Sequence, residues 1–275
     1  MNIQFYIPHP LLQQLVSYFM TFEAKMDAGT ASTVCPFPPT PQHCIYFYVN
    51  DPVQTQKAGT PHFITKPPSI TVGPQLTRVN IDIGRNHKML CVAFHPAGLY
   101  RLLGTPMHQL FDEDYDSSLL LGNGISQLNQ QLKEAVNPLQ LKILVENFLL
   151  KKIQGAKKTL PFDLAMQELV KTDGNAPIEK IAALSCLSLR QFERTCKERI
   201  GIPPKLFARL TRFSKAYRLK ESQTSLSWTS IAYECGYFDQ MHLIRDFKEF
   251  AGTTPTIMQH EIMASPLRLQ RNHYW

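Results

Sequence analysis

Four charged side chains between residues 188 and 198 have the chemistry needed to contact nucleic acid. They are Arg190, Glu193, Arg194 and Lys197. Helical spacing places them opposite the apolar residues Phe192 and Cys196 of the same segment. An Arg guanidinium can pair bidentately with guanine, and a Glu carboxylate can accept a hydrogen bond from cytosine. Alone, these residues could equally form the solvated face of an amphipathic helix, so their surroundings must decide.

A second set of such side chains lies about fifty residues later in the chain. It comprises Gln240, Met241, His242, Arg245 and Lys248. A Gln amide can pair bidentately with adenine, and a Met side chain can contact the methyl group of thymine. This second set therefore also has the chemistry to read DNA bases.

Each set lies on the second of two short helices that a tight turn joins. In the first unit, Ser188 and Gln191 have the spacing of a capping box, which fixes where the second helix begins. In the second unit, Asp239 follows the turn and provides the N-cap. Such a pair of helices matches a helix-turn-helix, whose second helix enters the major groove of double-stranded DNA.

The two units are copies of one pattern. Ile181-Ala182 recurs as Ile231-Ala232, and beyond a one-residue insertion the offset becomes 51. The later pairs are Ser188 with Asp239, Phe192 with Leu243, Cys196 with Phe247, Lys197 with Lys248, Gly201 with Gly252 and Pro204 with Pro255. A solvated surface would not need duplication, so the repeat favours two DNA-reading units. Residues 205–220 predict a continuous helix that holds them against successive major grooves, about 34 Å apart.

Positive charge is concentrated in the first unit. The chain has 275 residues with 29 Lys and Arg against 22 Asp and Glu, a net charge of +7. Residues 178–220 hold 11 basic and 3 acidic residues, a local charge of +8, whereas residues 221–249 carry −3. Because phosphate neutralisation makes DNA affinity salt-dependent, we expect most of that affinity in the first unit, with Arg209 and Arg212 among the contacts.

At these residues the chain resembles the AraC/XylS family of bacterial transcription regulators. The residues that carry the resemblance are Ile181-Ala182, Ser188, Phe192, Gly201, Pro204, Arg212, Ala216, Leu219, Ile231-Ala232, Gly236-Tyr237, Asp239-Gln240, Phe247-Lys248 and Thr254-Pro255. The resemblance implies a seven-helix DNA-binding domain with recognition helices at residues 188–198 and 239–249, and a contact with RNA polymerase. The chain departs from the family at Met258-Gln259, where a Tyr-Arg pair is usual, and at Leu243, where Phe is commoner.

The first part of the chain is expected to form a separate domain. Of the 20 prolines, 14 precede residue 160 and divide the chain into short β-prone runs. These runs are residues 43–49, 69–73, 79–83 and 88–94, and helical spacing then predicts two helices within residues 117–153. The fold class is therefore α+β. The expected parts are a mixed, mainly β domain ending in helices at 1–155, a linker at 156–160, an all-α DNA-binding domain with two helix-turn-helix units at 161–260 and a tail at 261–275.

Three roles for the first domain stay open. Residues 94–104 resemble a segment of the N-terminal domain found in some members of the family, which in relatives often senses a small molecule or dimerises. The domain could thus bind a small-molecule effector, form a homodimer, or act as an adaptor that only binds a protein partner. The apolar residues around Phe148 and Leu149 fit either an interface or the core of the domain.

Enzyme chemistry, cofactors and membrane insertion are not expected. A zinc or redox-linked enzyme-regulator built on His43, Cys44, Cys91 and His95 is disfavoured, because adjacent strand residues point to opposite faces. The segment 122–127 begins like a dinucleotide loop but lacks its third glycine. No apolar run reaches 18 residues, no secretory signal is visible and the six cysteines are scattered, which favours the bacterial cytoplasm, at the nucleoid when DNA is bound.

Overall fold

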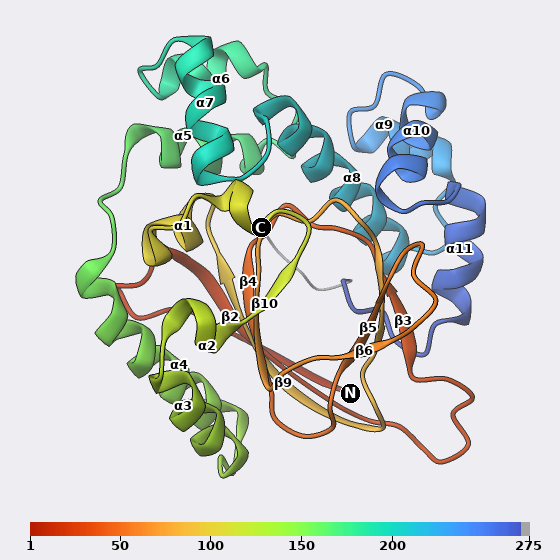
Figure 1. Ribbon diagram of the computed structural model, residues 1–275. Coiled ribbons are helices and arrows are strands. Elements are labelled where there is room, and N and C mark those ends of the chain that lie inside the picture. The colour runs from red at the N-terminus through yellow and green to blue at the C-terminus, as the bar shows by residue number, and fades with distance from the viewer. Residues whose placement is uncertain (271–275) are drawn as a thin grey trace.

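Two antiparallel sheets face each other in the first half of the chain (Figure 1). The computed structural model describes residues 1–270. The six-stranded sheet has the order β1 (Asn2–Tyr6), β2 (Val16–Lys25), β9 (Asn86–Phe94), β4 (Cys44–Tyr48), β7 (Ser69–Val72) and β10 (Asp114–Asp116). The four-stranded sheet has the order β3 (Val34–Phe37), β8 (Val79–Asp82), β5 (Gln54–Lys57) and β6 (Ile64–Thr65). Together they enclose an apolar interior.

Side-chain alternation decides what each face of the six-stranded sheet contacts. On β9, His87 and Met89 point between the two sheets, whereas Leu90 and Val92 point to the outer face. Both faces are covered, so the run from Leu90 to Phe94 is buried throughout. This explains why the strand reads as a continuous apolar segment rather than an alternating one.

Helices cover the outer face of this sheet (Figure 1). They are α1 (Gly98–Leu103), α2 (Ser117–Leu121), α3 (Gly124–Lys133) and α4 (Pro138–Lys152), with short 3-10 turns η1 (Met107–Leu110) and η2 (Ile153–Gly155). Leu141, Val145 and Leu149 of α4 are fully buried in the core that this sheet and the helices share. For Leu149 the core alternative is therefore confirmed, while Phe148 is only partly buried.

The predicted fold class is confirmed, and the predicted strands agree with β4, β7, β8 and β9. The longest strand, β2, was not predicted, although five of its ten residues are aromatic or β-branched. Residues 20–25 of this strand alternate apolar and polar side chains, and this was the available signal.

Seven helices form the second half of the described chain. They are α5 (Pro161–Lys171), α6 (Ile178–Leu184), α7 (Leu189–Arg199), α8 (Pro204–Ser222), α9 (Trp228–Glu234), α10 (Gln240–Phe250) and α11 (Pro255–Ala264). The long helix α8 runs between the other helices (Figure 1), and its Phe213 ring lies 4.9 Å from Phe247 of α10. Within residues 1–270, no helix combines the length and apolar sequence required to span a membrane.

The helical part packs directly on the β domain. Tyr100 of α1 donates a 2.6 Å hydrogen bond to Glu198 of α7, and Arg78 beside β8 forms a 2.6 Å ion pair with Glu261 of α11. Gly201, with φ of 96°, lies so close to the β domain that a Cβ there would fall 2.4 Å from Pro74. Residues 156–160, the expected linker, form neither helix nor strand and lie against α1, where Arg101 donates to the Lys157 carbonyl.

Candidate nucleic-acid interface

The first helix-turn-helix unit consists of α6, a turn and α7. Ser188 caps α7 by accepting a hydrogen bond from the Gln191 backbone, and Gln191 Oε1 accepts one from the Ser188 backbone at 3.0 Å. The predicted capping box is therefore confirmed. Phe192 and Cys196 are fully buried, which fixes the rotation of α7 about its own axis.

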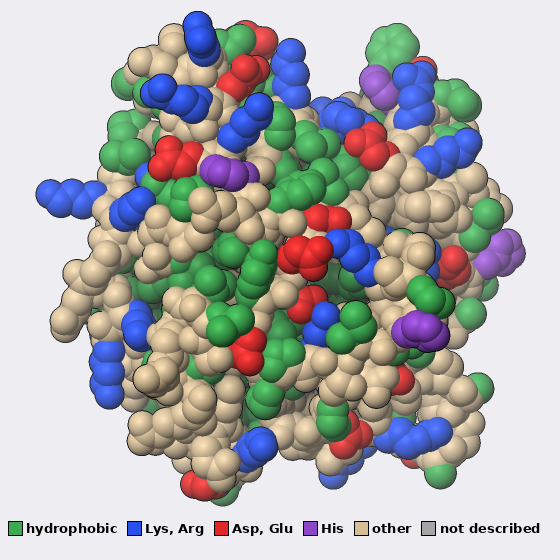
Figure 2. Space-filling model, viewed as in Figure 1, with side chains coloured by type: hydrophobic (Ala, Val, Ile, Leu, Met, Phe, Trp, Pro, Cys, Tyr) green, Lys and Arg blue, Asp and Glu red, His purple; other side chains and the backbone are tan. Residues whose placement is uncertain are grey.

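The predicted DNA-contacting side chains of α7 all face solvent. Arg190, Glu193, Arg194 and Lys197 are exposed, and none of them forms an ion pair within residues 1–270. Figure 2 shows Lys and Arg side chains over the upper part of the molecule, where Figure 1 places α6 and α7. This face is thus available to a polyanion.

The second unit, formed by α9, a turn and α10, repeats this arrangement. Asp239 caps α10 by accepting a 2.7 Å hydrogen bond from the His242 backbone, and Leu243 and Phe247 are fully buried. The predicted contact residues Gln240, Met241, His242, Arg245 and Lys248 are all exposed. In Figure 1 the two units lie at the same edge of the molecule, with α8 between them.

Two exposed aromatic residues of the second unit were missed by the sequence reasoning. Tyr233 in α9 and Phe238 in the turn are 88% and 91% exposed, and Met241 beside them is 57% exposed. Tyr233 occupies the position of Ala183 in the internal repeat. A large aromatic residue where the other copy has alanine was the available signal, and it adds apolar contact area to the face of this unit.

Arg209 and Arg212 of α8, both predicted to contact phosphates, have partners inside the protein. Arg209 Nη2 lies 2.6 Å from Asp246 Oδ1 of α10 and also pairs with Glu249. Arg212 donates to the Gly174 carbonyl at 3.1 Å, and its guanidinium lies 5.5 Å from the centre of the Tyr237 ring. Both side chains are only partly exposed, so they join α8 to its neighbours in the fold.

Other Lys and Arg residues between positions 178 and 220 also have partners within the fold. Arg199 forms a bidentate bond with the buried Asp163, Lys215 pairs with Asp173 at 2.9 Å, and Lys220 donates to two backbone carbonyls. Burial lowers the pKa of the half-buried Arg218 to about 10. Of the 11 cations in residues 178–220, only five are exposed, namely Lys180, Arg190, Arg194, Lys197 and Lys205.

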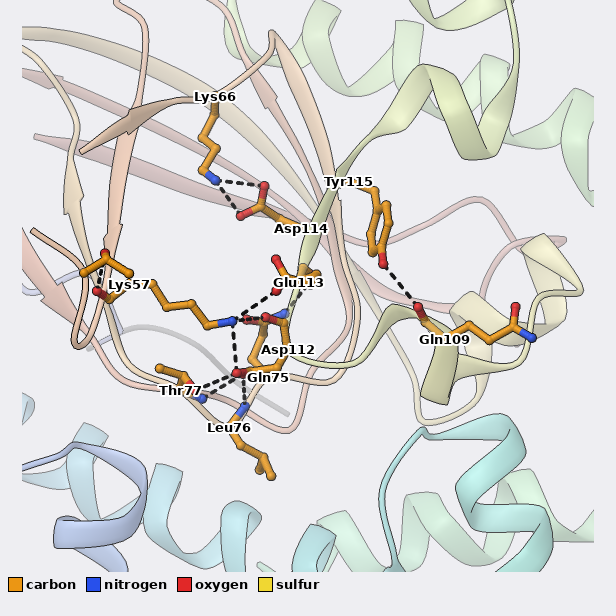
Figure 3. A network of polar contacts seen from close by, with 11 residues as sticks. Lys57, Lys66, Gln75, Leu76, Thr77, Gln109, Asp112, Glu113, Asp114 and Tyr115 are labelled. Atoms are coloured by element: carbon orange, nitrogen blue, oxygen red, sulfur yellow. Dashed lines mark hydrogen bonds and ion pairs between the residues drawn. The ribbon is translucent and has the colours of Figure 1, made fainter. Parts of the chain in front are cut away.

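The interior of the β domain forms a second candidate site. The space between the two sheets is a cavity of about 110 Å³, with mostly apolar and aromatic walls. Figure 3 shows the polar network at its edge, where Lys66 pairs with Asp114 at 2.8 Å and Lys57 reaches Asp112 and Glu113. Asp112 also accepts hydrogen bonds from the backbone of Leu76 and Thr77. The network joins the two sheets across the cavity edge.

The residues considered for zinc are not brought together. Within residues 1–270, no group of three or more His, Cys, Asp or Glu side chains is arranged to hold a metal ion. Cys44 and Cys91 share a small buried cluster with Tyr18 and Met20. His43 instead bonds to the backbone of Ile200, and burial lowers its pKa to about 4.

Known families match two parts of the chain. Residues 181–260 match a family described as a helix-turn-helix domain, and residues 4–116 match one described as a domain of unknown function (DUF6597). An uncharacterized HTH-type transcriptional regulator of Haemophilus influenzae is 35% identical over 80 residues, which are 29% of this chain. The match covers only 26% of the length of that relative.

Solved structures show weaker similarity over a longer stretch. Apo ToxT from Vibrio cholerae aligns with 89% of this chain and 97% of its own, at 14% identity and a TM-score of 0.48. A xylose-binding transcription activator, XylR, aligns with 48% of this chain and 38% of its own, at 20% identity and a TM-score of 0.33.

Proposed function

Because the chain carries a helix-turn-helix domain of the AraC type, we propose that it is a sequence-specific DNA-binding transcription regulator that acts on the bacterial chromosome in the cytoplasm. The observation that carries this proposal is the duplication of one exposed face. Both α7 and α10 start at a side-chain N-cap, bury two side chains at matching positions of the repeat, and present polar residues to solvent. Two such helices on one edge of the molecule fit two stretches of major groove.

In this proposal the first unit contacts both the bases and the phosphates of the DNA. Arg190, Arg194 and Glu193 are the base-reading residues, and Lys197 contacts phosphate. Each is exposed on α7 without an intramolecular ion pair in the described chain. The exposed Lys180 and Lys205 extend the positive surface at either side of the helix.

The second unit reads bases with little net charge. Gln240 and Met241 lie in the first turn of α10, where a recognition helix meets base edges, and His242 follows them. Arg245 and Lys248 lie further along the helix and provide one base contact and one phosphate contact. The exposed Tyr233 and Phe238 contribute apolar contacts to sugars or thymine methyl groups.

Selection of bound sequences from a random duplex pool, with the full-length protein, tests this function. We expect a two-part site whose halves are one helical turn apart. Arg194→Ala should cost about 1–3 kcal/mol at one base pair and leave preference elsewhere unchanged. Lys133→Ala, on the exposed surface of α3, is the matched control and should bind like the parent. A pool that shows no enriched sequence would overturn the proposal, and equal weakening on every sequence would make Arg194 a phosphate contact.

Control by an effector in the β domain is the favoured mode of regulation. The cavity between the sheets supports it, as does the contact of η1 and α1 with α7. Self-association is the second mode, because Leu139 and Ile143 of α4 are 52% and 44% exposed on its outer surface. Analytical ultracentrifugation with and without operator DNA distinguishes a homodimer from a monomer. Transcription in vitro with RNA polymerase distinguishes activation through a polymerase contact from repression.

A further inference from the structure

The cavity of the β domain has walls from both sheets and from the C-terminal segment, residues 265–270. Strands β2, β4 and β9 contribute aromatic and thioether side chains, and β7 and β8 contribute aliphatic ones. Arg268 and Leu269 of the C-terminal segment complete the wall. An apolar cavity of about 110 Å³ is of the order of those that take up one small aromatic molecule.

Nδ1 of His87 is a buried polar atom of this wall that lacks a hydrogen-bond partner within residues 1–270. Its side chain is only 3% exposed, and the ring packs 5.3 Å from Phe22 and 6.4 Å from Tyr48, both of which also line the cavity. Burial lowers the pKa of His87 to about 4, against a hydrogen bond to the Ile83 backbone. The ring is therefore neutral at pH 7, and Nδ1 has no hydrogen-bond partner within the described residues. A neutral imidazole nitrogen without hydrogen accepts a hydrogen bond.

The two charged groups of the wall, Asp114 and Arg268, each form a polar contact within the fold. Asp114 pairs with Lys66 at 2.8 Å, as Figure 3 shows, and Arg268 donates to the Ser265 carbonyl at 3.0 Å. A buried acceptor left without a partner costs free energy, so a ligand donor that reaches it gains affinity. A carboxylate placed against the same nitrogen would gain nothing, because it has no hydrogen to donate at pH 7.

We propose that this cavity binds an uncharged, mainly apolar molecule whose hydroxyl or N–H group donates a hydrogen bond to Nδ1 of His87. The regulatory meaning of this site rests on the proposed function, but the binding itself does not. Its occupant contacts the C-terminal segment, in which Gln270 bonds to the Pro38 carbonyl near β3 and to Glu221 of α8. Ligand binding is thereby linked to the helices that carry the DNA-contacting units.

Three para-substituted benzenes test the proposal by calorimetry on the full-length protein. The probes are 4-propylphenol, 4-propylanisole and 4-propylbenzoate, which differ in carrying a donor, an acceptor only, or a negative charge. We expect the phenol to bind roughly tenfold more tightly than the anisole, the effect of one buried hydrogen bond. His87→Phe keeps the aromatic packing and removes the acceptor. This variant should bind the phenol and the anisole with about equal affinity. His62→Phe, at an exposed histidine, is the matched control and should keep the preference.

Each other outcome overturns the proposal. Equal affinity of the parent protein for the phenol and the anisole would show that His87 does not bind the ligand. Tightest binding of the benzoate would show that Arg268 makes the polar contact. Binding of none of the probes removes the site. If His87→Phe does not fold, the imidazole nitrogen shifts of the parent protein decide, since only the phenol should move the Nδ1 resonance. Operator binding is measured on the same preparation without probes, so loss of the ligand site and loss of the DNA-binding function are seen separately.

Discussion

Arg209 and Arg212 should contribute to stability rather than to the salt dependence of DNA binding. If all 11 cations of residues 178–220 met phosphates, they would add about 10 to the slope of log affinity against log salt. The five exposed ones limit this contribution to about 4.5. The decisive comparison is therefore between Arg209→Gln/Arg212→Gln and Lys197→Gln/Lys205→Gln, two changes that each remove two positive charges.

The structure sets the size of the two effects. Arg209 pairs with Asp246, whose side chain is 3% exposed, while Arg209 itself is 38% exposed. Without Arg209, Asp246 keeps the Tyr237 hydroxyl at 3.1 Å as a donor. Breaking a fully buried pair costs 3–5 kcal/mol, and the partial exposure of Arg209 reduces this to about 2 kcal/mol. Neutralising Lys197 and Lys205 should leave the free energy of unfolding unchanged within about 0.5 kcal/mol.

Fluorescence anisotropy on the selected operator duplex, from about 50 to 200 mM salt, gives the slopes. Urea unfolding of the same preparations gives the stabilities. The lysine pair should flatten the slope by about 1.8, so that the fourfold rise in salt weakens binding about twelvefold less than in the parent. The arginine pair should keep the parental slope and unfold at lower urea. A slope reduced by about two in the arginine pair, with an unchanged urea midpoint, would show that these residues meet phosphates and that the internal pairs are not formed.

Three further predictions concern stability. Cys186 has a left-handed φ of 56°, so Cys186→Gly should raise the free energy of unfolding by about 1 kcal/mol, measured by urea unfolding against Cys186→Ala. His43 and His87, both with pKa lowered to about 4, stay neutral when folded but are protonated below about pH 6.5 when unfolded. Stability should therefore fall between about pH 6.5 and 4, by up to about 3 kcal/mol for each histidine, and variants with Gln there should show a flatter pH profile. Leu149→Asp, in the core, should yield unfolded or insoluble protein, whereas Ile143→Asp should stay folded and, if α4 mediates a dimer, become monomeric by sedimentation.

Local patterns were enough to predict the helix-turn-helix units. The caps at Ser188 and Asp239 depend on residues three positions apart, and the buried positions follow the helical period. The bounds that the family resemblance implied, 188–198 and 239–249, lie within one residue of those of α7 and α10. The strand β2 was missed although residues 20–25 alternate apolar and polar side chains, the period of a strand.

The partners of the basic residues could not be predicted, because they lie far away in the sequence. Arg209 and Asp246 are 37 positions apart, and Arg199 and Asp163 are 36 apart. The first pair requires α8 to pack against α10, and the second requires α7 to pack against α5. A count of charges within a window treats these cations as free, so the sequence overestimates the surface available to phosphates. The cavity was missed for the same reason, since its wall combines residues from the first strand to residue 269.

The contacts between the domains differ for the two helix-turn-helix units, and this limits how the β domain can act on them. At the first unit, Tyr100 bonds to Glu198 at the end of α7 itself, and Gly201 lies against Pro74 and Met107. On the side of the second unit, the β domain contacts α11, where Arg78 pairs with Glu261, and the C-terminal segment, where Gln270 donates to the Pro38 carbonyl. A shift of η1 or α1 would therefore turn a recognition helix directly, whereas a change at the cavity wall would first move the segment that follows α11. An effector in the cavity is consequently expected to alter the spacing of the two units more than the base preference of the first.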